Sequence, residues 1–95
     1  MADWSVLSND LKVCSVIYEY TNVKGDKVWL SKLEKIMSKD MSRVTLSKSL
    51  DKLFDLGMID GKWEDVDGRW VRVFRVAGEA EDLIKSVYSN TKRPA

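Results

Sequence analysis

Apolar residues recur at helical spacing in the first part of the chain. The repeat follows Ser8-Asn9-Asp10, three residue types that commonly cap the start of a helix, and it is broken at Asn22 and Gly25. The apolar positions are Leu11, Val13, Cys14, Val16, Ile17, Tyr18 and Tyr20. This wide stripe predicts a first helix that is largely buried.

A short apolar run and a possible capping box come next. Val28-Trp29-Leu30 predicts a short edge strand, which Trp29 would anchor. Ser31-Lys32-Leu33-Glu34 has the S-x-x-E pattern in which the serine and the glutamate each satisfy a backbone donor at the start of a helix. We therefore predict a short second helix from Lys32 to about Ser38, whose inward side chains are Leu33, Ile36 and Met37.

A third helix is predicted from Ser42, a good N-cap residue, to Leu56. Its apolar stripe falls at i, i+4, i+7 and i+8, on the residues Leu46, Leu50, Leu53 and Phe54. At about 100° per residue, the opposite side carries Val44, Lys48, Asp51 and Asp55, flanked by Thr45 and Lys52. Gly57 follows as the residue that ends the helix in a left-handed conformation.

The dipeptide Asp67-Gly68 lies between two β-prone segments and predicts a two-residue hairpin turn. Counting outward from it gives the pairs Val66 with Arg69, Trp63 with Arg72, Gly61 with Phe74, Asp60 with Arg75, and Ile59 with Val76. In this register Gly61 makes room beside Phe74. One face collects Ile59, Trp63, Phe74 and Val76, and the outer face carries Lys62, Glu64, Val71 and Val73.

Three tryptophans are assigned from this pattern. Trp63 is on the inward face of the hairpin and is predicted to be core. Trp70 has the same parity but lies next to the turn, so it either packs on a neighbouring subunit or covers the hairpin. Trp4 either caps the core or joins a contact with a partner.

A last helix is predicted to open at Gly78-Glu79. Its apolar side is wide enough to serve the core on one edge and a second subunit on the other, through Ala80, Leu83, Ile84, Val87 and Tyr88. Trp4, Val6 and Leu7 can join the same homodimer interface; alternatively, both termini close a monomeric core. Residues 1–7 and 90–95 are expected to be terminal extensions, with a frayed tail from Asn90.

The composition narrows the function classes. A chain of 95 residues with 44% hydrophobic content is enough for one domain, which we place at 1–95. One cysteine precludes an internal disulfide, and the absence of histidine removes the commonest general base and the commonest metal ligand. No apolar run spans a bilayer, and the start MADWSVLSND lacks a secretory signal. We expect a cytoplasmic protein that is not an enzyme and uses no metal or cofactor.

Two local features have a chemical and a structural interpretation. Cys14 lies on the buried stripe of the first helix, where we expect a small hydrophobe; a redox sensor would need exposure and a basic neighbour. The run Asp65-Val66-Asp67-Gly68 lacks the later glycine and glutamate of a calcium loop, so it is interpreted as the hairpin turn.

The net charge of +1 is well short of a nonspecific nucleic-acid coat protein, but the positive charge is unevenly distributed. The segment from Lys24 to Lys62 has nine basic and six acidic residues, an excess of +3. The predicted third helix lies within this segment.

The predicted order is helix, short strand, helix, helix, hairpin, helix: an α+β, mainly α arrangement. Two runs carry a resemblance to a known family, SRVTLSKSLDKLFDLGMID and WEDVDGRWVRVFRVAGEAEDLI. With this order and these runs, the chain resembles winged helix-turn-helix transcriptional regulators of the small bacterial and archaeal MarR, PadR and ArsR type. The first run is similar to the recognition helix of that family, and the second to its wing. Metal sensing of the ArsR kind is not expected, because the chain lacks histidine and has a single cysteine.

The resemblance implies that the third helix enters the major groove of double-stranded DNA. Its first turns would put short polar and basic side chains on base edges and phosphates. The residues carried over are Ser42, Arg43, Thr45 and Lys48, with Ser47, Ser49 and Lys52 as weaker candidates and Arg69 and Arg72 as minor-groove or backbone contacts from the wing. Arginine is the better base reader, whereas the lysines suit phosphates.

Two other interpretations of these residues are open. The polar side of the third helix can simply be solvated. A winged helix can also serve as a protein-interaction module, which the near-zero net charge, the acidic residues of the wing and the outward Val71 and Val73 would favour.

Overall fold

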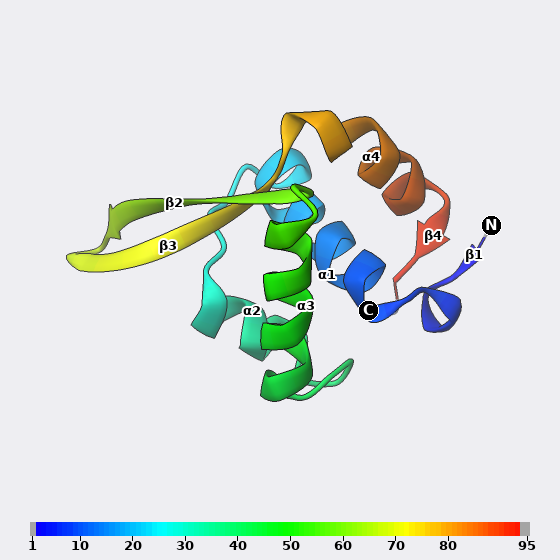
Figure 1. Cartoon of the computed structure of the whole chain (residues 1–95), viewed down its shortest axis with the longest axis horizontal. Helices are drawn as coiled ribbons and strands as arrows, with labels where there is room; N and C mark the ends of the chain where they lie inside the picture. The colour runs from blue at the N-terminus through cyan, green and yellow to red at the C-terminus, as the bar shows by residue number, and fades with distance from the viewer. Residues whose placement is uncertain (1, 94–95) are drawn as a thin grey trace.

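Within residues 2–93, which this computed structural model describes, four α-helices surround a small core and a long hairpin projects from them (Figure 1). The main elements are α1 (Asn9–Tyr18), α2 (Leu30–Ile36), α3 (Arg43–Asp55), β2 (Ile59–Val66), β3 (Arg69–Val76) and α4 (Glu81–Ser89). Two-residue strands, β1 (Ala2–Asp3) and β4 (Thr91–Lys92), pair near the termini. The longest dimension is 41 Å, because the hairpin extends away from the helices (Figure 1).

The helix α1 forms the centre of the core, as its sequence predicted. Ser8 caps it: the Ser8 Oγ accepts a hydrogen bond from the Leu11 backbone N–H at 3.2 Å. Every residue from Val13 to Tyr18 is buried. The helical path does not end before Asn22 but continues as a π-helix over Glu19–Val23.

The structure also confirms the predicted cap, apolar stripe and end of α3. Ser42 is the N-cap, and its Oγ accepts a hydrogen bond from the Thr45 backbone N–H at 3.2 Å. Leu46, Leu50 and Leu53 are buried, while Phe54 is half-buried. The chain leaves the helix at Gly57, whose φ of +71° is the left-handed conformation that favours glycine.

The predicted strand and capping box before α2 are both wrong. The helix begins at Leu30, its N-cap is Trp29, and no side chain caps it. Because the helix begins before Ser31, that serine lies in the first turn and cannot act as the N-cap; Glu34 instead forms an ion pair with Arg43 (Nε–Oε1 3.1 Å). Val28 is fully buried, and its carbonyl accepts one hydrogen bond from the Phe74 N–H at 2.9 Å, so this segment borders β3 without forming a strand.

The register of the hairpin is the predicted one at every position from Ile59 with Val76 to Val66 with Arg69. Asp67 and Gly68 have φ of 53° and 79°. Two consecutive positive φ angles are the signature of a type I′ turn, whose twist matches that of the flanking strands. The turn sequence therefore fixed which side chains share a face.

Burial on the hairpin differs from expectation. Trp63 is not core but 56% exposed, because the hairpin that carries it extends away from the helices (Figure 1). Trp63 stacks instead on Trp70, with ring centroids 6.5 Å apart and an interplanar angle of 11°. Conversely, Val73 is buried and Val71 half-buried, because the side of the hairpin predicted to be outer packs on the body near its base.

The described residues near both termini are tied to the body, so the predicted frayed tail is wrong as far as Arg93; residues 94–95 lie outside the described part. Trp4 caps the core, and its Nε1 donates to the Asp40 carboxylate at 2.8 Å. The Arg93 guanidinium donates to the Ile36 carbonyl at 3.1 Å and lies 5.5 Å from the centroid of the Trp4 ring. The termini thus hold the turn between α2 and α3.

The last helix begins with a 3-10 turn, Gly78–Ala80, and continues as α4. Of its apolar side, Ala80 and Ile84 are buried, Val87 and Tyr88 are half-buried, and Leu83 is 57% exposed. Tyr88 packs on Tyr18 of α1, with ring centroids 5.3 Å apart. The predicted stripe therefore closes the core and leaves one apolar edge in solvent.

Replacing Leu46 with alanine should lower the free energy of unfolding by about 2–5 kcal/mol, since it leaves a cavity under α3. Val44 lies on the same helix but is 64% exposed, so Val44→Ala should change that free energy by no more than about 0.5 kcal/mol. Urea denaturation followed by tryptophan fluorescence measures both. Equal losses for the two variants would contradict this orientation of α3.

Candidate nucleic-acid interface

The exposed side of α3 carries part of the predicted set. Arg43 is 77% exposed and its pair with Glu34 is a surface ion pair, which contributes only about 0–1 kcal/mol and so leaves the guanidinium available. Lys48 is exposed and, among the residues the structure describes, has no carboxylate within ion-pair distance. Thr45 is half-buried, and its hydroxyl accepts a hydrogen bond from the Ser42 hydroxyl at 3.1 Å.

Other members of the set lie elsewhere. Ser49 is buried at 6% exposure and therefore cannot contact DNA; it faces inward because it is three residues after Leu46 on the same helix. Lys52 is exposed but directed toward α1, where its Nζ is 2.9 Å from the Asp10 carboxylate. Ser47 is half-buried and lines a groove between α3 and the hairpin.

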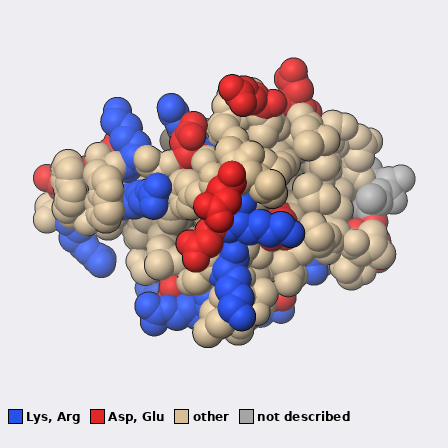
Figure 2. All heavy atoms as spheres, in the orientation of Figure 1, with Lys and Arg blue, Asp and Glu red and all other residues tan. Residues whose placement is uncertain are grey.

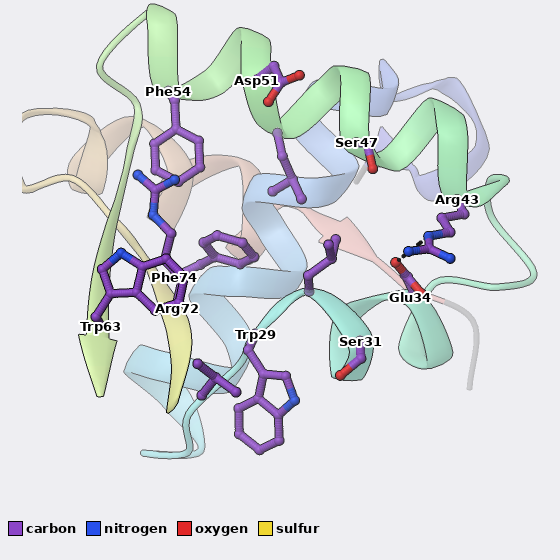
Figure 3. A pocket seen from close by; sticks show the side chains of 13 residues that line it. Trp29, Ser31, Glu34, Arg43, Ser47, Asp51, Phe54, Trp63, Arg72 and Phe74 are labelled. Carbon is purple, nitrogen blue, oxygen red and sulfur yellow. Dashed lines mark ion pairs between the residues drawn. The ribbon is translucent and has the colours of Figure 1, made fainter. Parts of the chain in front are cut away.

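This groove, bounded by α2, α3 and the hairpin, has a volume of about 490 Å³ (Figure 3). Its apolar lining comes from Trp29, Leu30, Leu50, Phe54, Trp63, Val71 and Phe74, and its polar lining from Ser31, Glu34, Arg43, Ser47, Asp51 and Arg72. Trp29, expected to anchor a strand, instead contributes one wall. Arg43, whose side chain is 77% exposed, also lines the groove, so the groove opens beside the exposed first turn of α3.

Arg72 connects the hairpin to α3. Its guanidinium lies over the Phe54 ring, 4.1 Å from the centroid, and Phe54 in turn contacts Phe74 edge-on at 5.7 Å (Figure 3). The room beside Gly61 is used by Arg72 and not, as predicted, by Phe74: a Cβ at Gly61 would collide with the Arg72 side chain. A glycine inside a strand often marks a close approach of another group, so Gly61 was the feature of the sequence that could have indicated the position of Arg72.

The charges of the wing partly cancel. The Lys27 ammonium pairs with Glu64 at 2.9 Å, and this hydrogen bond lowers the pKa of the Glu64 carboxyl. Asp60 faces Arg75 across the strands, with nitrogen and oxygen 3.9 Å apart. Near the tip, Asp65 and Asp67 are exposed beside the exposed Arg69. The wing is therefore not a basic surface, although Arg69 stands at its tip.

Figure 2 shows the same mixture over α3, where basic and acidic side chains lie next to one another and no uniform basic stripe forms. The acidic residues are Asp51 and Asp55, which are exposed on the side of the helix that carries Lys48. Such a surface supplies individual donors at defined positions and little long-range attraction.

No helix within residues 2–93 combines the length and apolar character needed to cross a bilayer. Cys14 is buried, and desolvation raises its pKa to about 12, with a smaller contribution from Asp10. A thiol in this state is neither a nucleophile nor a redox sensor at neutral pH, in agreement with the expected packing role.

Two solved structures are similar to this chain over 87% of its length. One is the circadian clock associated protein Pex from Anabaena, with 18% identity, 76% of that chain covered and a TM-score of 0.66. The other is Pex from Synechococcus sp. (strain PCC 7942), with 23% identity, 78% of that chain covered and a TM-score of 0.60. No family model and no curated protein matches. At these identities the similarity shows a shared fold, and it confirms the winged-helix architecture.

The Cys14 thiol should resist alkylation by iodoacetamide at pH 8 in the folded protein. With a pKa of about 12, the thiolate fraction at pH 8 is on the order of one in ten thousand, and burial excludes the reagent as well. In concentrated urea the thiol returns to its ordinary pKa and should react completely. Mass spectrometry counts the adducts, and rapid modification of the folded chain would contradict the described environment.

Proposed function

We propose that this chain is a cytoplasmic, sequence-specific double-stranded DNA-binding transcriptional regulator whose recognition helix is α3. The observation that carries the proposal is that α3 buries its leucine stripe and exposes two cations, Lys48 opposite the stripe and Arg43 in the first turn beside the groove, within a winged-helix fold. An α-helix fits the major groove of B-DNA, and the residues at the start of such a helix are the ones that reach base edges.

The residues take different roles in this proposal. Arg43, in the first turn, is the candidate base reader, because its planar fork can pair with both acceptors of guanine. Lys48 serves as a phosphate contact, Thr45 contributes a hydroxyl from the side of the helix near Lys48, and Ser47 contributes one from the groove side. Ser42 acts chiefly as the helix cap, and Lys52 reaches phosphate only by leaving Asp10. Arg69 at the wing tip contacts the backbone or the minor groove, and Arg72 contacts DNA from the base of the wing.

We further propose a homodimer that joins α4 to the N-terminal segment. Leu83 and Val6 are the exposed apolar side chains of these two segments. A two-fold dimer presents two recognition helices, which suits a pseudopalindromic site with half-sites about 10 base pairs apart or a multiple of this spacing. Assignment to the MarR, PadR or ArsR type stays a prediction from the sequence.

A second candidate function is a protein-interaction module that does not bind DNA. The stacked and exposed pair Trp63 and Trp70 favours it, since exposed tryptophans are frequent anchors of protein interfaces. Val73, which the sequence pattern placed on the outer face in support of this alternative, is buried and does not support it.

Replacing Arg43 and Lys48 with alanine should weaken binding to DNA fragments selected from a random duplex library by roughly tenfold or more. The salt dependence should fall as well, by about one unit of slope for each phosphate that the variant no longer neutralises. Fluorescence anisotropy in a series of salt concentrations measures both quantities. Lys85→Ala, an exposed lysine of α4, is the matched control and should bind as the unsubstituted chain does. Unchanged binding by the double variant would exclude α3 as the recognition helix.

Replacing Leu83 with glutamate should convert the proposed dimer into a monomer, because a charge at the centre of an apolar interface is left unpaired. Sedimentation velocity measures the change in mass. Lys85→Glu introduces the same carboxylate on the same helix, two residues away and also exposed, and should leave the assembly intact. A chain that is already monomeric without substitution would exclude the dimer but not DNA binding.

A further inference from the structure

The Arg72 guanidinium is held at a defined place between the wing and α3. It stacks at 4.1 Å over Phe54, which belongs to the last turns of α3, and Trp63 faces it directly across the two strands (Figure 3). An arginine side chain free in solvent loses rotamer freedom when it binds, whereas one already stacked on an aromatic ring has lost part of it beforehand. Arg72 is therefore preorganised.

Gly61 is the residue that permits this conformation. It is the only residue of β2 without a side chain, and a methyl group built on it would overlap the Arg72 side chain. Any other residue at position 61 would push the guanidinium off Phe54 or force the strands apart. The φ of Gly61 is not in the left-handed region, so backbone strain does not account for a glycine here. The close approach of Arg72 does account for it.

The guanidinium retains its hydrogen-bonding capacity. Within residues 2–93 no carboxylate lies within 4.0 Å of it, although the side chain lines the groove together with Asp51. The other two charged residues of the groove, Arg43 and Glu34, neutralise each other. Arg72 is exposed although its guanidinium lies 4.1 Å from the centroid of the Phe54 ring, so its N–H groups are available to an acceptor. The acceptor that suits such a fork is a phosphate or a carboxylate.

We propose that Gly61 and Phe54 are positioning residues that hold Arg72 in the groove, where its guanidinium binds one DNA phosphate at the junction of α3 and the wing. The inference rests on the proposed function and specifies it. A phosphate bound by Arg72 would hold the wing and the recognition helix on the same DNA strand. We assign a DNA phosphate as the acceptor because Arg43 and Arg72 line the same groove. A duplex that contacts Arg43 therefore also passes Arg72.

The positioning is tested first without DNA. Protons of a side chain stacked over an aromatic ring are shifted upfield by the ring current, so the Arg72 Hδ and Hε resonances should be displaced in the unsubstituted chain. Gly61→Ala should move them toward their ordinary values while the rest of the spectrum outside the wing is preserved. Phe54→Leu keeps an apolar side chain on α3 but removes the ring, and should have the same effect. Undisplaced Arg72 resonances in the unsubstituted chain would overturn the positioning.

The phosphate contact is tested with duplex DNA by anisotropy across a salt series. Arg72→Ala should weaken binding about tenfold and lower the salt slope by about one, as expected when one phosphate is no longer neutralised. Gly61→Ala should weaken binding about threefold or more in the natural background and have no further effect in the Arg72→Ala background, which identifies the two residues as coupled. Gly78→Ala is the matched control, because a methyl group there meets nothing within 4 Å. Its binding should be unchanged.

A further variant tests the sign of the local field. Asp51 is the one carboxylate of the groove without an ion-pair partner among the described residues, so Asp51→Asn should strengthen binding if a phosphate lies near Arg72. DNA binding that Arg72→Ala leaves unchanged would overturn the phosphate contact and leave the proposed function standing. Absence of salt-sensitive DNA binding by the unsubstituted chain would overturn both.

Discussion

The packing of Leu46, Leu50 and Leu53 against the body of the protein is the interaction on which the rest of the structure depends. Because successive helix residues are about 100° apart, burying this stripe fixes the rotation of α3 about its own axis. Lys48, which lies roughly opposite the stripe, is then exposed by geometry, whereas Arg43 lies on the stripe side in the first turn, at the edge of the groove. The Ser42 cap fixes where the helix starts, and the interactions of Trp4 and Arg93 with Asp40 and the end of α2 hold the preceding turn. Three parts of the chain that are distant in sequence therefore determine the position of one exposed helix face.

The hairpin transfers a second constraint to the same place. Positive φ angles at Asp67 and Gly68 select one register, and a slip of one residue would send every side chain of a strand to the opposite face. In the observed register Gly61 and Arg72 lie on the face that meets Phe54. The turn at the tip of the wing thus determines which side chains face Phe54. The groove forms because this register and the buried leucine stripe place the hairpin face and α3 opposite each other.

The elements that could be predicted from the sequence are those with a strong local signal. The cap at Ser42, the leucine period and the Asp67-Gly68 turn each specify a local geometry, and the structure has all three of these geometries.

The features that could not be predicted depend on where elements end relative to one another. Trp63 lies on the predicted face of the hairpin, the one that also carries Ile59 and Phe74. It is exposed because the hairpin extends beyond the core. The S-x-x-E pattern at Ser31 did not form a capping box because α2 begins one residue earlier, at Leu30, with Trp29 as its N-cap. The fixed tail arises from interactions of Arg93 with three segments that no local pattern connects. The same reasoning applies to the candidate site. The exposure of Lys48 and the burial of Ser49 follow from their helical spacing relative to the leucine stripe, whereas the exposure of Arg43 and the position of Arg72 over Phe54 depend on the tertiary structure.

The balance of charge has a consequence for how such a surface would recognise DNA. A protein that relies on counterion release brings many uncompensated cations to the duplex and gains most of its affinity without reference to sequence. Here the net charge is +1, Arg43 and Lys52 have carboxylate partners, and Asp51 and Asp55 lie beside Lys48. Nonspecific attraction is therefore weak, and an ill-fitting duplex would meet acidic side chains without the donors that compensate for them. In the proposed function, discrimination would rest on a few donors fixed in place beforehand, of which Arg72, held over Phe54 beside a glycine, is the most constrained. Weak attraction at one domain also makes a second copy valuable, since two linked recognition helices multiply a modest affinity without adding charge.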